Sequence, residues 1–141
     1  MAKTNFDEIT LDKVKLANAE LANPNAEETI TWFFSGALST GAKKDAALLG
    51  KTGTITDVRA YLDTPGTGTS TIVDVNKNGT TIFTTQANRP TIAAGANASS
   101  TAGPDVTSVA AGDRLSVDLD QLGTGGADLY VSVTIKRAHA S

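Results

Sequence analysis

The chain has 141 residues, the length of a single domain, and a domain of this length buries roughly two thirds of the surface that its unfolded form exposes. It has no cysteine and one histidine, His139, which excludes disulfides and thiolate metal sites and nearly excludes a Ser-His-Asp triad. A net charge of -3 gives no excess of positive charge with which to bind nucleic acid or an anionic membrane. No apolar run approaches the roughly 18 residues of a membrane span, and the polar, acidic N-terminus is unlike a secretory signal. The abundance of Thr, together with 13 Gly, favours a β-rich domain that is not an enzyme and uses no cofactor.

Residues 1–25 differ from the rest of the chain, because about half of them are charged or amide-bearing and Pro24 closes the stretch. Their apolar residues fit both helical and strand spacing, and neither pattern is long enough to bury a face alone. We expect an N-terminal arm, ordered by packing on its own domain or on a neighbour, followed by one β-sandwich domain over residues 26–141. The arm is too apolar for a disordered tail, and its candidate contact residues are Phe6, Ile9, Leu11, Val14, Leu16 and Leu21.

The domain begins with an aromatic strand over residues 29–34, in which Ile30, Trp32 and Phe34 share one face and Phe33 takes the other. This alternation favours a core anchor plus one interface residue over a ligand-stacking platform. Residues 43–50 have helix-forming composition but are short, so we expect a loop with one helical turn. Residues 52–62 are predicted to form a long strand with two faces: Ile55, Asp57, Arg59 and Tyr61 on one, and Thr54, Thr56, Val58, Ala60 and Leu62 on the other.

The strongest local signal is a hairpin, in which runs 70–76 and 80–85 flank Asn78-Gly79. A short strand is expected within residues 91–94. Two alternating strands follow, over residues 114–120 and 128–137, with Gly-rich turns between them. This makes about seven or eight short strands and no long helix, which predicts an all-β fold, an antiparallel β-sandwich of jelly-roll type.

Two segments match parts of known binding motifs. Asp74 to Gly79 fits the first half of a calcium loop, but the twelfth position is Thr85 instead of Glu, which favours a plain hairpin. Gly50-Lys51-Thr52 resembles the end of a phosphate-binding loop, but Asp45 stands where that motif needs Gly. Neither match predicts a metal or nucleotide site.

Three carboxylates are candidates for acid–base chemistry of the kind that glycoside hydrolysis uses: Asp118, Asp120 and Asp128. Asp118 and Asp120 fall on the outward face of an alternating strand, and no interior histidine or nucleophile motif accompanies them. A solvated or edge-protecting face is the favoured interpretation.

Several stretches of the segment from Thr31 to Arg137 resemble virion structural proteins of tailed bacteriophages. They are FSGALSTGA (34–42), GTITDVRAYLDTPGTGTSTIVDVNKNGTTIFTT (53–85), RPTIAAGANASS (89–100) and VAAGDRLSVDLDQLG (109–123). The resemblance covers roughly two thirds of the chain and implies a structural β-sandwich module of the virion, as found in capsid-associated and tail-fibre proteins.

A compact head with an arm, and with no long shaft or second domain, fits a non-enzymatic capsid decoration (cement) protein that braces the outer capsid surface. The resemblance implies a homotrimer, the major capsid protein as partner, and location on the virion after synthesis in the host cytoplasm. The alternative is a tail-tip or fibre-head module that binds host-surface carbohydrate, and a small depolymerase using the three carboxylates is the third possibility.

Overall fold

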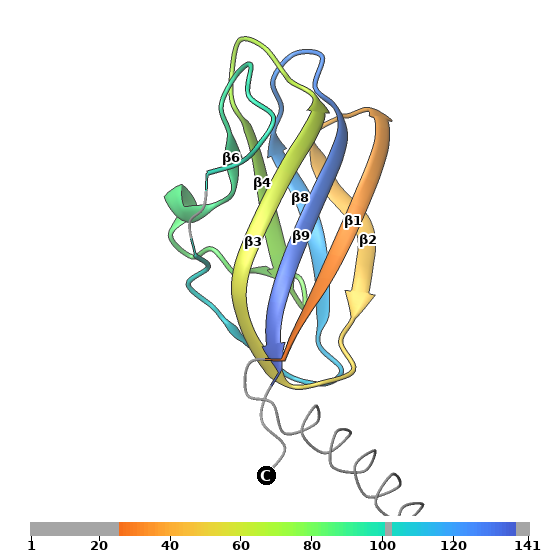
Figure 1. Ribbon diagram of the computed structural model, residues 1–141, viewed down its shortest axis with the longest axis vertical. Coiled ribbons are helices and arrows are strands. Elements are labelled where there is room, and N and C mark those ends of the chain that lie inside the picture. Colours follow the sequence, from red (N-terminus) through yellow and green to blue (C-terminus); the bar gives the residue numbers. More distant parts are fainter. Residues whose placement is uncertain (1–25, 101–102, 138–141) are drawn as a thin grey trace, which may run out of the picture.

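The computed structural model describes residues 26–100 and 103–137. Within them the chain forms nine strands and one 3-10 helix, η1 (Gln86–Asn88), and two antiparallel sheets pack face to face (Figure 1). The arm and its six candidate contact residues lie outside the described residues. No helix in the described part is long and apolar enough to cross a membrane.

The strand order is that of a jelly roll. Sheet A has the order β1-β9-β3-β7, with β1 (Glu27–Ala37), β9 (Ala127–Arg137), β3 (Gly53–Thr64) and β7 (Ser108–Val109). Sheet B has the order β2-β8-β4-β5, with β2 (Gly41–Leu48), β8 (Arg114–Gln121), β4 (Thr71–Lys77) and β5 (Thr80–Thr81), and β6 (Thr91–Ile92) also pairs with β4. Successive strands mostly alternate between the sheets, as in a jelly roll with one additional short strand. The predicted all-β sandwich is confirmed.

The core lies between the sheets and is built from alternate residues of the long strands. Sheet A contributes fully buried Val58, Leu129 and Val131, and sheet B contributes Val75 and Val117. Each such side chain contributes about 1.5–3 kcal/mol by leaving water. The predicted faces of the first strand are also confirmed, with Trp32 7% exposed and Phe33 49% exposed.

The predicted faces of β3 are wrong at one end, because a β-bulge interrupts its pairing with β9 between Ile55 and Asp57. The extra residue shifts the alternation, so Ile55 is buried on the same side as Val58, Ala60 and Leu62. Arg59 and Tyr61 lie outward as expected. A strict period of two cannot reveal this shift from the sequence.

The loop with a helical turn that was predicted for residues 43–50 is also wrong. Most of this segment belongs to edge strand β2, which pairs with β8 and has a register shift between Lys43 and Ala46. Pairing with β8 overrides the helix-forming composition of the segment.

The hairpin at Asn78-Gly79 is confirmed. Both residues have positive φ, 52° and 87°, as a two-residue turn of type I′ requires. The return strand is shorter than predicted and ends at Thr81, because Ile82 and Phe83 are both fully buried. Two consecutive buried side chains do not fit a strand with one face toward solvent.

Candidate interaction surfaces

Three aromatic side chains form a row across the outer face of sheet A. Phe33 of β1 and Tyr61 of β3 lie directly opposite Tyr130 of the central strand β9. The ring centroids of Phe33 and Tyr130 are 4.5 Å apart with a tilt of 35°, and those of Tyr61 and Tyr130 are 6.3 Å apart and edge-on at 61°. We call these three residues the aromatic row.

The aromatic row is held in place yet stays open to solvent. Its members are 49%, 44% and 36% exposed in the order Phe33, Tyr61, Tyr130. Tilted and edge-on aromatic pairs stabilise a sheet by about 0.5–1.5 kcal/mol each beyond the area that they bury. The row is therefore ordered by its own contacts, and adjacent exposed apolar side chains of this kind mark interaction sites.

Carboxylates surround the hydroxyl end of Tyr130. Its Oη donates a hydrogen bond to Oδ2 of Asp63 at 3.4 Å. Partial desolvation raises the pKa of Tyr130, and the nearby charges of Asp63 and Asp128 raise it further. Acidic side chains therefore lie near the central residue of the row, whereas on the same strand as Tyr61 an ion pair joins Arg59 Nε and Asp57 Oδ2 at 2.5 Å.

The row has one closed side and one open side. On the closed side, residues 97–99 run along β3: Asn97 Nδ2 donates to the carbonyl of Leu62, and the Ser99 hydroxyl accepts from the amide of Ala60. On the open side lies β1, an edge strand that pairs only with β9 among the described residues. A ligand or partner thus has access to the row from the β1 side and from above.

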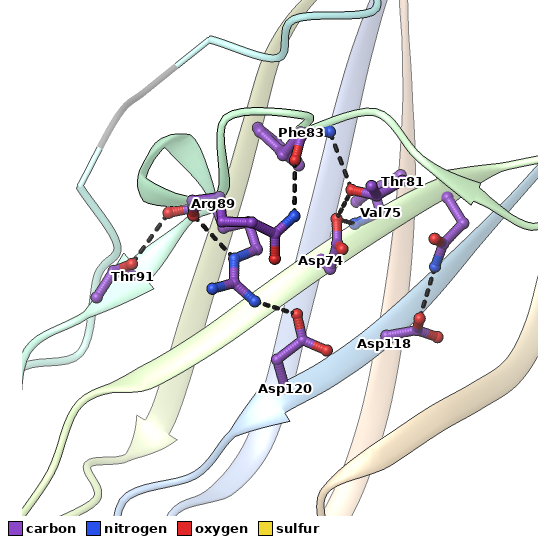
Figure 2. Close-up of polar contacts among 10 residues, drawn as sticks. Asp74, Val75, Thr81, Phe83, Arg89, Thr91, Asp118 and Asp120 are labelled. Atoms are coloured by element: carbon purple, nitrogen blue, oxygen red, sulfur yellow. Dashed lines mark hydrogen bonds and ion pairs between the residues drawn. The ribbon is translucent and has the colours of Figure 1, made fainter.

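The outer face of sheet B carries a polar cluster, shown in Figure 2, in which each carboxylate has a partner. Asp74 Oδ1 accepts from the hydroxyl of Thr81 and from the amide of Val75. The second pair joins Asn76 Nδ2 to Asp118 Oδ2 at 2.7 Å, and the third joins Arg89 Nη1 to Asp120 Oδ2 at 2.5 Å. We call Asp74, Asn76, Thr81, Arg89, Asp118 and Asp120 the polar cluster.

Asp74 is 6% exposed, and burial raises its pKa above the ordinary value of 3.8. The hydrogen bond from Thr81 opposes this shift, and the charge of Asp120 adds to it. Asp74 stands directly opposite Asp118 on the neighbouring strand. Asp74, the third acid of this face, was not among the predicted site residues, although its place between Val73 and Val75 in an alternating strand indicates an outward position.

The three candidate catalytic carboxylates are not brought together. Asp118 and Asp120 lie on sheet B, whereas Asp128 lies in β9 of sheet A, where its Oδ1 accepts from the amide of Gly36 at 2.6 Å. Asp118 and Asp120 are engaged by Asn76 and Arg89. This trio therefore forms no shared site.

The two motif-like segments fold as ordinary connections. Asp74 and Asn76 belong to the β4–β5 hairpin, with Asp74 Oδ1 and Asn76 Nδ2 engaged as described. The parts of the chain that the structure describes contain no group of three potential metal ligands. Gly50-Lys51-Thr52 joins β2 to β3, and no helix follows it, as a phosphate-binding loop would require.

Both ends of the described chain meet at one pole of the sandwich (Figure 1), where the amide of Arg137 donates to the carbonyl of Ala26 at 3.0 Å. Beside them a groove of about 170 Å³ opens at the ends of β1, β2 and β9. We call it the pole groove; it is lined by Glu28, Ile30, Ala47, Leu48, Leu49, Gly50, Lys51, Thr52, Ile135 and Arg137.

No protein-family model matches this sequence, and no curated protein is detectably similar to it. Among solved structures, a chain of the "Cyanophage Pam1 capsid asymmetric unit" aligns with 80% of this chain and 84% of its own length, with a TM-score of 0.46 and 18% identity. Similarity at this level does not by itself assign a function.

Proposed function

We propose that this protein is a structural component of a bacteriophage virion, and more specifically a capsid decoration protein. It would bind the outer surface of the assembled shell and brace neighbouring copies of the major capsid protein. Its arm would supply capsid or intersubunit contacts, for which the candidate residues are Phe6, Ile9, Leu11, Val14, Leu16 and Leu21. The proposed assembly is a homotrimer, because symmetric contacts repeated over a lattice add avidity even where each contact is modest.

The jelly-roll topology is the observation that carries this proposal, since the jelly roll is a recurrent architecture of viral capsid and lectin domains. Among proteins with this architecture, the sequence resemblance over residues 31–137 favours virion proteins of phages. The pole at which Ala26 lies adds a geometric reason, because an arm that leaves from one end can follow a shell while the sandwich stands away from it.

The proposal is tested by binding of purified protein to capsids that lack it, measured by co-sedimentation. Replacing Leu11, Val14 and Leu16 with Asp should weaken binding at least about a hundredfold, because three buried aliphatic contacts are lost. The matched control places the same charges at Thr4, Thr10 and Asn18, which are polar positions of the arm, and should bind nearly as the unchanged protein does. Equal binding by both variants would contradict the role of the arm.

The second candidate function is a tail-tip or fibre-head module that binds host-surface carbohydrate, and the aromatic row is the observation that favours it. Exposed aromatic rings beside carboxylates offer stacking surface and hydrogen-bond acceptors to a sugar. This function predicts binding to cell-wall polysaccharide that is lost in Tyr130→Ala and unaffected by the arm variants. The decoration function predicts the reverse pattern.

A further inference from the structure

Apolar side chains make up part of the lining of the pole groove, and Leu48 is the most exposed large hydrophobic residue among them. Leu48 is 75% exposed, the largest value among the exposed large hydrophobic residues of the described chain. Ile30 of β1 and Ile135 of β9 line the groove with it. The groove thus lies where the edge strands of the two sheets, β1 and β2, come closest to the origin of the arm.

The outward position of Leu48 is fixed by its neighbours. It pairs with Arg114 in the ladder between β2 and β8. The next residue, Leu49, is 6% exposed, and its amide and carbonyl are bound to the carbonyl of Asp113 and the amide of Gly112 at 2.8 Å and 2.7 Å. Because the backbone is held on both sides, the exposure of Leu48 belongs to the ordered fold. Together with Ile30 and Ile135 it supplies apolar surface to the groove lining.

Arg137, which also lines the groove, has a polar atom that lacks a partner among the described residues. Its Nε is buried and has no hydrogen-bond partner among the described residues. A buried donor on a charged group is costly to leave unpaired, and native proteins rarely do so. An acceptor for this donor is therefore expected, either a water or chain that lies outside the described residues.

Two segments outside the described residues join the chain beside Arg137: residues 138–141, which follow it directly, and the arm. The arm joins the described chain at Ala26, whose carbonyl already accepts the amide of Arg137. Leu21 precedes Ala26 by five residues, which reach at most about 17 Å when extended. The groove lining carries two cationic side chains, Arg137 and Lys51, against one acidic side chain, Glu28, so the carboxylate of the neighbouring Glu20 suits it in charge as well as in reach.

We propose that residues 20–25 of the arm dock into the pole groove of their own molecule. Leu21 covers Leu48, and an oxygen of the same stretch accepts the hydrogen bond from Arg137 Nε. Docking fixes the direction in which the rest of the arm leaves the sandwich. It assigns Leu21 to the protein's own domain and leaves residues 6–16 for a partner, and it does not depend on which partner that is.

Disulfide trapping tests the proposal in the full-length protein, which has no cysteine of its own. The pair Leu21→Cys and Leu48→Cys should form a crosslink within one chain on mild oxidation, because a disulfide requires Cα atoms within about 7 Å. The matched control pair is Leu21→Cys with Tyr61→Cys, since Tyr61 is also exposed but lies toward the other end of β3. The first pair should react at least about tenfold faster than the control.

Two results of the trapping experiment would overturn the proposal. One is a crosslink within the chain that forms no faster than in the control pair. The other is a product that joins two chains, which would assign the groove to the arm of a second copy. Both products are distinguished by mass spectrometry and non-reducing gels at several protein concentrations.

Limited proteolysis provides a second measurement that needs no cysteine. A glutamate-specific protease should cut after Glu20 about tenfold faster in Leu48→Asp than in the unchanged protein, because the docked state protects this bond. Leu48→Met keeps the apolar contact and should be cut at the original rate, as should Tyr61→Asp at the distant aromatic row. Equal rates in Leu48→Asp and Tyr61→Asp would contradict docking.

Discussion

The outer faces of the two sheets follow the same alternation of residues but carry different chemistry. On sheet B the outward residues of the central strands β4 and β8 include acids and an amide that are engaged by neighbours, as with Asp118 and Asn76. On sheet A the outward residues of the central strands include the aromatic row, which satisfies its own packing and leaves its upper surface free. These polar side chains on sheet B therefore stabilise the fold through hydrogen bonds within the protein, whereas the aromatic row is available to a partner.

The largest effect expected from this difference is the loss of Asp74. Asp74→Ala removes the acceptor for the Thr81 hydroxyl and the Val75 amide, and should lower the free energy of unfolding by about 1–3 kcal/mol. Urea denaturation gives this value directly. The matched change on sheet A is Asp63→Ala, an exposed acid, which should stay within about 0.5 kcal/mol of the unchanged protein. A similar loss in both would show that the faces do not differ.

The two ion pairs give a closer comparison, because both have an N–O distance of 2.5 Å and differ in exposure. The side chain of Arg89, which reaches Asp120 of sheet B from the segment between η1 and β6, is 19% exposed, and that of Arg59 on sheet A is 68% exposed. Arg89→Met should cost about 1–2 kcal/mol, since Asp120 loses its ion pair and the Gln86 carbonyl loses the Arg89 Nε donor.

The matched change on sheet A, Arg59→Met, should cost about 0–0.5 kcal/mol, because solvent screens exposed pairs. Thermal unfolding of the two variants in the same buffer tests the order. An equal or larger loss in Arg59→Met would refute it.

Residues of the aromatic row should matter more for binding than for stability. Phe33→Thr keeps a strand-forming side chain and removes one ring contact, so the expected loss of stability is about 0.2–1 kcal/mol. If the row binds a partner, the same change weakens that binding by a larger factor than the change in stability explains. A loss of several kcal/mol in unfolding would instead make the row a structural feature.

The smallest expected effect is a pH dependence that arises from Asp74. Burial raises its pKa from 3.8, so the folded protein holds this proton more tightly than the unfolded chain, and stability falls as pH rises through the window above 3.8. Asp74→Asn keeps an acceptor without the charge, and should gain stability relative to the unchanged protein as pH rises.

Unfolding at about pH 3 and about pH 7 measures the difference between the two proteins. The pKa values of Asp105 and Asp113 are lowered by hydrogen bonds, which acts in the opposite direction but equally in both proteins. A difference that stays constant with pH would contradict the raised pKa of Asp74.

Most of the fold follows from the sequence because its long strands alternate strictly and Asn78-Gly79 marks a hairpin. The errors have local causes that no periodicity reveals. The bulge after Ile55 adds one residue to β3, and β2 adopts the strand conformation through its pairing with β8 in spite of its composition. The outward position of Phe33 in the aromatic row was predicted from the sequence. Its neighbours Tyr61 and Tyr130 join the row only through the register of three strands, which the sequence does not reveal.

The most direct test of the proposed function is the number of copies per virion, measured by quantitative mass spectrometry of purified particles against the major capsid protein. The account predicts a copy number comparable to that of the capsid lattice, in the hundreds, as symmetric shells with repeated contacts require. A few copies per particle would contradict the decoration function. They would place the protein in the tail or a fibre, where the aromatic row becomes the surface to study.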